Sequence, residues 1–161
     1  MATVYIETSV VSHAAARPHP DPVVRALQVQ AREWWDTQRP RFELVTSQLV
    51  LDEASLGDAG AAADRLRLLA GIRLVSVDEN ARRIADTLVA KSVMPQKAYV
   101  DALHVACAAA AGVEYLLTLN CRHIANARTL PRVYATLDDL GVARPLICTP
   151  VEFLGEPENE P

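Results

Sequence analysis

Short runs of β-branched, aliphatic and aromatic residues recur along the chain, and longer stretches with apolar residues at helical spacing separate them. The runs predict strands at residues 3–7, 42–46, 73–77, 114–119 and 146–149. The stretches between them predict helices, because their apolar positions return every three to four residues. Strands that alternate with helices along a whole chain are typical of a parallel, twisted α/β sheet with helices on both faces.

Capping signals mark where several of these helices begin. Thr8 and Ser9 follow the first strand and offer caps for a short helix, and Ser47 offers a cap after the second strand. Asp21 and Asp78 stand in the corresponding position before two further helices. A further helix is expected at about residues 61–70, and an alanine-rich segment predicts another at residues 97–111.

The composition is that of one ordinary globular domain. The chain has 161 residues, of which 50% are hydrophobic and 22% charged, which suffices for one buried core. We expect a single domain over residues 1–151 and a disordered, acidic, proline-rich tail at 152–161. The formal net charge of −4 argues against a protein that grips nucleic acid by a broad basic surface. An RNA substrate would therefore need divalent cations, held by carboxylates, to screen its phosphates.

The cysteines and the apolar runs indicate the compartment. Cys107, Cys121 and Cys148 are far apart, odd in number and without a CxxC spacing, so neither a disulfide framework nor a zinc knuckle is expected. No stretch resembles a signal peptide, and none approaches the ~20 apolar residues that span a bilayer. These features predict free thiols and a cytoplasmic protein that does not enter a membrane.

Polar side chains stand where the predicted strands end. Glu7 closes the first strand, directly after a run expected to be buried, and Asn120 follows the fourth strand. Open α/β sheets bind ligands outside the carboxyl ends of their strands, so both positions are candidates for a functional site. Glu53 and Asp101 lie on helices that follow loops. Carboxylates, completed by water and phosphate, are ligands that Mg²⁺ and Mn²⁺ prefer, and a metal held there can activate a water molecule.

Several polar residues at these positions also have a purely structural interpretation: Glu7 could be an acid near a helix start, and Asn120 could cap the turn after its strand. Asp101 could complement the dipole at the N-terminus of its helix. Thr8 and Ser9 could be helix caps only, or their hydroxyls could hold a metal-bound water or a phosphate. The neighbouring Asp52 is an alternative to Glu53 as the metal-binding acid of this helix.

Three residues beside these positions are candidates for substrate contacts or for steadying a ligand. His104 follows Asp101 by three residues on the same helical face, and His123 lies close after Asn120. Either histidine could touch phosphate or support a metal ligand, or could be a structural side chain. Arg122 is the best candidate for a basic phosphate contact.

Four segments of the chain resemble, in order, the motifs of one family. They are YIETSVVS from Tyr5, SQLVLDEASLGD from Ser47, YVDALHVACAAAAGVEYLLT from Tyr99 and LNCRHIANA from Leu119. In this order and spacing the chain resembles the PIN-domain family, and within it the VapC-type toxins of bacterial toxin–antitoxin pairs. The resemblance covers roughly residues 3–151.

The resemblance implies a three-layer α/β/α fold around a sheet of four to five strands, and a metal-dependent endoribonuclease that uses Mg²⁺ or Mn²⁺. By position, Glu7 takes the place of the family's first acid, which is usually Asp. Glu53, rather than Asp52, matches the second acid, and Asp101 matches the third. Asn120 stands where many members have a fourth Asp, and would complete the metal shell. Glu7 is longer than Asp by one carbon–carbon bond, ~1.5 Å, and Asn120 lacks a charge, which should weaken binding of a second metal.

The resemblance further implies a toxin that acts on RNA, forms a homodimer and is blocked by a cognate antitoxin protein. Two alternatives stay open at this point. One is a catalytically weak or inactive PIN module that binds RNA or a protein partner. The other is a phosphatase-like hydrolase that uses the same carboxylate-bound metal on a small substrate.

Overall fold

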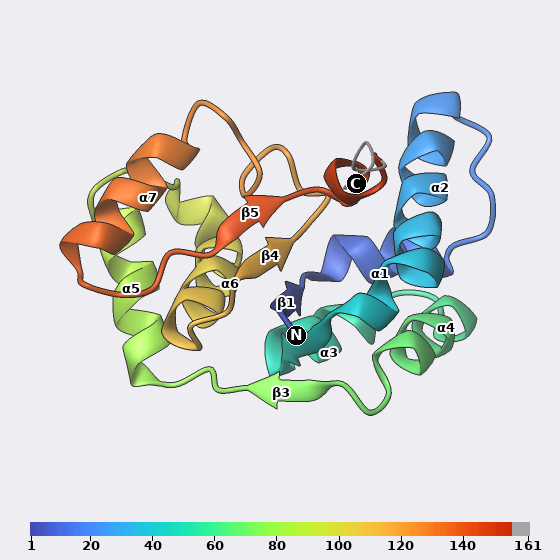
Figure 1. The fold of residues 1–161 in the computed structure, drawn as a ribbon, viewed down its shortest axis with the longest axis horizontal. Helices are drawn as coiled ribbons and strands as arrows, with labels where there is room; N and C mark the ends of the chain where they lie inside the picture. Colours follow the sequence, from blue (N-terminus) through green and yellow to red (C-terminus); the bar gives the residue numbers. More distant parts are fainter. Residues whose placement is uncertain (156–161) are drawn as a thin grey trace, which may run out of the picture.

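The computed structural model describes residues 1–155 and has a five-stranded parallel sheet at its centre (Figure 1). The strands are β1 (Thr3–Ile6), β2 (Glu43–Ser47), β3 (Arg73–Val75), β4 (Tyr115–Leu117) and β5 (Leu146–Cys148). They lie in the order β3-β2-β1-β4-β5, and every neighbouring pair is parallel. The parallel α/β sheet expected from the sequence is therefore confirmed, with all five predicted strands present and most of them shorter than predicted.

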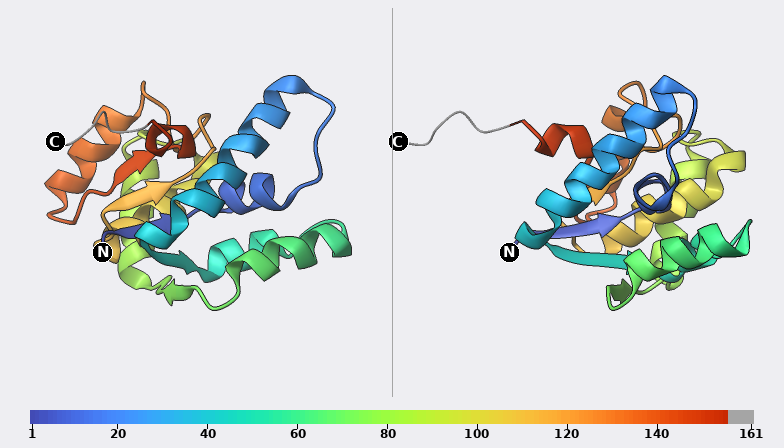
Figure 2. Two further views of the ribbon diagram at one scale, coloured as in Figure 1. Left: turned by 45° about the vertical axis from the view of Figure 1, so that its right-hand side comes forward. Right: turned by 90° about the vertical axis from the view of Figure 1, so that its right-hand side faces the viewer.

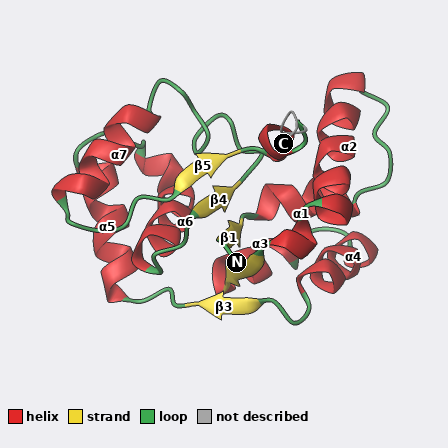
Figure 3. Ribbon diagram, viewed as in Figure 1, coloured by secondary structure: helices red, strands yellow, loops and turns green. Residues whose placement is uncertain are grey.

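Helices cover both faces of this sheet and complete the three expected layers (Figures 1 and 3). The α-helices are α1 (Thr8–Ala15), α2 (Pro22–Thr37), α3 (Gln48–Ala54), α4 (Ala59–Leu69), α5 (Glu79–Ala90), α6 (Tyr99–Ala110) and α7 (Leu130–Asp139). The short 3-10 helices are η1 (Arg39–Arg41), η2 (Gln96–Ala98) and η3 (Pro150–Phe153). On one side α6 and α7 pack with α5, and on the other α1 lies between α2 and α4 (Figure 2).

The core runs along β1 and α6. Val4, Tyr5 and Ile6 are completely buried, as expected for the central strand of a sheet covered on both faces. Every residue of α6 from 102 to 109 is buried. A helix that is apolar all round must be enclosed, and its alanines let it approach the sheet and α5 closely. The alanine-rich segment predicted from the sequence is thus the central buried helix, and its first turn carries Asp101 to the edge of the core.

Two of the capping predictions are confirmed and two need correction. Asp21 and Asp78 accept hydrogen bonds from the backbone amides at the starts of α2 and α5, at 2.8 and 2.9 Å. Glu7 is not the last residue of a strand: it follows β1 and is itself the N-cap of α1, in place of Thr8 or Ser9. Ser47 occupies the N-cap position of α3 but makes no capping bond, because its hydroxyl faces another side chain.

The C-terminal boundary lies later than the sequence suggested. Glu152 and Phe153, expected in the tail, belong to η3. Phe153 packs edge-on against the rings of Phe42 and Tyr115, with ring centroids 5.5 and 5.4 Å away. The rest of the expected tail, from residue 156, lies outside the described residues. Within residues 1–155, no helix has both the length and the apolar character required to cross a bilayer.

Candidate active site

The candidate residues gather where the order of the strands reverses. The chain passes from β1 outward to β2 and β3, and then returns to place β4 on the other side of β1. At such a point the segments after the two central strands diverge to opposite faces and leave room for a ligand. Glu7 follows β1, and Thr118 and Asn120 follow β4. The sheet topology therefore brings the beginning and the later part of the chain together at one edge.

Glu7 is held firmly at this edge by one of its two carboxylate oxygens. The side chain is 4% exposed. Its Oε2 accepts hydrogen bonds from the Ser9 amide (3.1 Å), from the Ser9 hydroxyl and from the Thr118 hydroxyl (2.7 Å). The Ser9 oxygen in turn accepts from the Leu119 amide at 2.8 Å, which ties the start of α1 to the segment after β4. Among the described residues no donor reaches Oε1 of Glu7, so this oxygen is available to a ligand.

Glu53 is likewise held through one of its two carboxylate oxygens. It lies on α3, partly exposed, and its Oε1 accepts from the Thr8 hydroxyl at 2.7 Å and lies 2.6 Å from Nε2 of His104. Burial raises the pKa of the Glu53 carboxyl, but its hydrogen bonds with His104 and Thr8 outweigh this effect. The pKa therefore lies below its ordinary value. Its neighbour Asp52 is exposed and accepts a bond from Gln48, as expected of a solvated helix residue.

Asp101 stands in the first turn of α6, where the helix dipole favours a negative charge. Its Oδ1 accepts a hydrogen bond from Nδ2 of Asn120 at 3.1 Å. Burial raises the pKa of Asp101 above its ordinary value, and the nearby His104 and His123 and the Asn120 bond offset this only in part. The Glu53 carboxylate adds to the rise, so the two acids are electrostatic neighbours.

Asn120 connects the acids to the following loop through both ends of its amide. While Nδ2 donates to Asp101, Oδ1 accepts from the His123 amide at 3.0 Å. Its own backbone amide donates to the Thr118 hydroxyl at 2.9 Å. As a metal ligand, the Asn120 oxygen would therefore contact both the metal and the His123 amide. The structure presents Asn120 first of all as a side chain that orients Asp101.

The remaining candidates differ in how closely they join the acids. His104 is completely buried, and both ring nitrogens have polar neighbours, Glu53 on one side and Tyr5 on the other. His123 is half-buried and close enough to affect the pKa of Asp101. Arg122 is exposed on the same loop, and its side chain makes no ion pair with the described acids. The structure thus brings His104 and His123 to the site and leaves Arg122 at its rim.

The geometry singles out a small group of possible metal ligands. One ligand atom each from Glu7, Glu53 and His104 lies within 4.8 Å of the other two. Sequence reasoning found these three residues but missed Thr118, Tyr5 and Ser47, which hold them in place. A Tyr within a strand and a Thr after one carry no local signal of function, because their partners lie 42 to 111 residues away along the chain.

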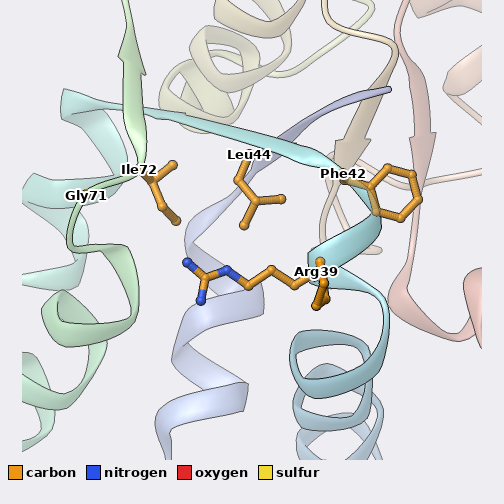
Figure 4. Close-up of a pocket in the computed structure, with 6 residues that line it drawn as sticks. Arg39, Phe42, Leu44, Gly71 and Ile72 are labelled. Atoms are coloured by element: carbon orange, nitrogen blue, oxygen red, sulfur yellow. The ribbon is translucent and has the colours of Figure 1, made fainter. Parts of the chain in front are cut away.

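A pocket elsewhere on the surface has a different character. About 400 Å³ in volume, it lies at the amino-terminal ends of β2 and β3, at the opposite end of these strands from the acids (Figure 4). Its lining is mostly apolar, and the Arg39 side chain extends across it toward Ile72. Its lining contains no carboxylate, so the pocket offers nothing to a metal. The acidic edge of the sheet remains the candidate active site.

Comparison with known proteins gives one match, to a family model. Neither the curated proteins nor the solved structures gave a significant match to this chain. The family model of the PIN domain matches residues 4–128, a range that begins in β1 and ends in the loop after Asn120. The matched range includes Glu7, Glu53 and Asp101. With more than half of its length covered by this match, the chain belongs to the PIN domain family.

Proposed function

We propose that this protein is a metal-dependent endoribonuclease that hydrolyses RNA phosphodiester bonds at the edge formed by Glu7, Glu53 and Asp101. PIN domains are generally metal-dependent nucleases. One observation carries the proposal for this chain: where the strand order reverses, ligand atoms of Glu7 and Glu53 lie within 4.8 Å of each other, and Asp101 is close enough to Glu53 for the two charges to interact. Each of the three acids has one oxygen held by protein donors. Acids that only solvate a surface do not need to be fixed in this way.

The donor set fits a hard divalent cation. Glu7, Glu53 and Asp101 supply carboxylate oxygens, and Mg²⁺ and Mn²⁺ prefer such ligands, completed by water and phosphate. Acids brought together repel one another unless a cation lies among them. Burial is the main cause of the raised pKa of Asp101, and the neighbouring Glu53 carboxylate adds to it. We therefore assign Mg²⁺ or Mn²⁺ as the cofactor.

The surrounding residues have distinct tasks in this proposal. Thr8 and Ser9 hold the Glu53 and Glu7 carboxylates by hydrogen bonds, and Asn120 holds Asp101. His123 lies near Asp101, and Arg122 stands at the exposed rim where a phosphate of the RNA would arrive. A divalent ion bound to such acids neutralises phosphate charge and lowers the pKa of a coordinated water. The chain's own part is to keep the ligands oriented with one oxygen of each acid free.

We further propose that the protein is the toxin of a toxin–antitoxin pair. This role is supported by the resemblance of the four ordered motifs to VapC-type toxins. In this role the protein forms a homodimer, and a cognate antitoxin covers the acidic edge. Production of the protein in bacteria should then slow growth, and Asp101→Ala should relieve the effect. Co-production with the product of an adjacent small reading frame should restore growth and yield a stable complex.

The activity itself is tested by RNA cleavage in the presence of Mn²⁺. Removing groups that only support a metal ligand typically costs about 10- to 100-fold, so losing a ligand in Asp101→Ala or Glu53→Gln should cost more than about 100-fold. The matched control is Asp52→Asn, which changes the exposed acid next to Glu53 and should cleave like the wild type. Cleavage that survives Asp101→Ala would contradict the site. Metal binding without cleavage of any RNA would instead support a PIN module that binds RNA or a protein.

A further inference from the structure

We propose that a buried chain of hydrogen bonds from Ser47 through Tyr5 to His104 positions the Glu53 carboxylate for metal binding. The Ser47 and Tyr5 hydroxyl oxygens are 2.6 Å apart, and the Tyr5 hydroxyl lies 2.9 Å from Nδ1 of His104. All three residues are completely buried. The inference rests on the proposed function, because it takes Glu53 as a metal ligand. It assigns a task to Tyr5 and Ser47, which the acids alone do not explain.

For a His104 ring that carries one proton, the donors and acceptors fix the direction of this chain. An ionised carboxylate only accepts hydrogen bonds, so the contact of 2.6 Å between Glu53 Oε1 and His104 Nε2 requires the proton to be on Nε2. In the neutral ring Nδ1 is then an acceptor, and the Tyr5 hydroxyl is the donor beside it. Because the Tyr5 hydroxyl donates its proton to His104, its oxygen accepts a hydrogen bond from the Ser47 hydroxyl. The Tyr5 hydroxyl thus selects the tautomer in which His104 donates to Glu53.

The position of Ser47 supports a specific role for the chain. Serine at the N-cap of a helix ordinarily accepts from a backbone amide of the first turn, and losing that bond costs stability. At the start of α3 this bond is absent, and the Ser47 hydroxyl contacts Tyr5 instead. The same helix carries Glu53. The structure therefore uses its capping residue to orient the histidine that holds the acid further along α3.

The same contacts argue that His104 acts through Glu53 rather than as a metal ligand. Its Nε2 lies within reach of a shared cation, but both ring nitrogens already have hydrogen-bond partners and the ring is not exposed. Coordination through Nε2 would break its bond to Glu53. Carboxylates that bind a metal are commonly oriented by hydrogen bonds from groups that do not touch the metal themselves. His104 and Tyr5 are positioning residues in this assignment.

The decisive experiment measures Mn²⁺ affinity by titration calorimetry in the full chain. Tyr5→Phe should weaken Mn²⁺ binding about 10- to 100-fold, with RNA cleavage recovered at high Mn²⁺ concentration and the KM for RNA unchanged. Tyr134→Phe is the matched control, because its hydroxyl accepts a hydrogen bond from the Ile147 amide far from the acids. That control should bind Mn²⁺ like the wild type. Wild-type affinity in Tyr5→Phe would overturn the inference.

A second pair of variants keeps the test sharp if Tyr5→Phe folds poorly. Glutamine at position 104 places an amide nitrogen near the former Nε2, whereas asparagine places one near the former Nδ1. His104→Gln should therefore retain much more Mn²⁺ affinity than His104→Asn. Equal losses would contradict a role as donor to Glu53. A nitrogen coupling to bound Mn²⁺ in the electron paramagnetic resonance spectrum that disappears in His104→Gln would show a direct ligand and overturn the assignment.

The outcome for positioning can be separated from the outcome for catalysis. If the wild type binds Mn²⁺ but cleaves no RNA, and Tyr5→Phe still weakens binding, the nuclease proposal fails while the positioning inference stands. If Glu53→Gln binds Mn²⁺ as tightly as the wild type, Glu53 is not a ligand and the positioning inference is overturned. If RNA cleavage is normal in Tyr5→Phe at limiting Mn²⁺, only the positioning inference falls.

Discussion

The Thr118 hydroxyl donates a hydrogen bond of 2.7 Å to Oε2 of Glu7, although 111 positions separate the two residues in the chain. Thr118 is completely buried, and its oxygen also accepts from the Asn120 amide at 2.9 Å. One small side chain thus contacts both the acid after β1 and the residue that orients Asp101. This contact joins the carboxyl ends of the two central strands and fixes the relative placement of the acids.

Thr118→Val should loosen Glu7 while preserving the shape of the core. The variant removes a hydrogen bond to a charged group, about 1.5–3 kcal/mol, together with the acceptor of the Asn120 amide, and leaves Glu7 to the donors of Ser9. Mn²⁺ affinity, measured by titration calorimetry, should fall about 10-fold. Thr136→Val is the control, since this nearly buried threonine donates to the Arg132 carbonyl within α7. Equal loss of Mn²⁺ affinity in both variants would mean that the effect is general destabilisation and not Glu7.

Glu7→Asp restores the residue that the family usually has at this position, and it should reduce activity. The partners of Glu7 are placed for the longer side chain, since Oε2 meets both Ser9 and Thr118. Shortening by ~1.5 Å withdraws the carboxylate from at least one of them. RNA cleavage with Mn²⁺ should drop about 10- to 100-fold. Glu43→Asp, at the exposed start of β2, should cleave normally. An increase above the wild-type rate in Glu7→Asp would refute this account of the Glu7 contacts.

The parts of the structure that were predictable are those set by local sequence. The strands follow from short β-branched runs, and Asp21 and Asp78 cap their helices because the capping bond joins residues two or three positions apart. Glu7 could be recognised because a charge directly after a buried strand is unusual. Glu53 and Asp101 were candidates as carboxylates on helices that follow loops, but only the resemblance grouped them with Glu7, since their helices do not reveal which edge they face.

The parts that escaped prediction are set by contacts between distant segments. Ser47 follows the local rule for a helix cap, yet Tyr5 replaces the expected partner. Tyr5 itself has the pattern of an ordinary core residue in a buried strand. The sequence likewise carries no sign that the Asn120 amide joins Asp101 to the His123 backbone. In each case the register of the sheet and the packing of α6 decide which group a polar atom meets, and the sequence carries no local sign of it.

Asn120→Asp should make the stability of the protein depend on metal. In the wild type the Asn120 amide donates to Asp101 at 3.1 Å, and an aspartate there would place two carboxylates side by side. Without metal the variant should lose about 1–3 kcal/mol of stability. Mn²⁺ should restore more than this loss, because a bound cation relieves the repulsion and stabilises the folded state by mass action. Thermal unfolding with and without Mn²⁺ measures both effects.

The control for this prediction is Asn126→Asp on the same loop. The Asn126 amide donates to the Arg122 carbonyl at 3.0 Å and contacts no acid. Asn126→Asp should therefore lose a similar hydrogen bond without any added response to Mn²⁺. An Mn²⁺-induced shift in Tm that is no larger for Asn120→Asp than for the wild type would place Asn120 outside the metal site.

The three cysteines should differ sharply in reactivity. Cys121 is exposed in the loop between Asn120 and Arg122, whereas Cys107 and Cys148 are buried. Burial raises the pKa of Cys107 to about 11 and that of Cys148 to about 12. Because the thiolate is the reactive form, iodoacetamide at pH 8 should modify Cys121 alone in the folded protein. Mass spectrometry after labelling in denaturant should show all three modified, and early labelling of Cys148 in the folded state would contradict its burial.

The buried thiols also predict how stability changes at alkaline pH. In the unfolded chain Cys148 ionises near 9.0, while in the folded protein its pKa is about 12. Between these values the folded state keeps a proton that the unfolded state loses, so the free energy of unfolding falls as the pH rises above about 9. The loss approaches about 1.4 kcal/mol per pH unit for one thiol. Urea unfolding at pH 8 and pH 10 should show a smaller decline in Cys148→Ala than in the wild type, by about 1 kcal/mol. Parallel declines in the two proteins would mean that Cys148 ionises as readily when folded as when unfolded.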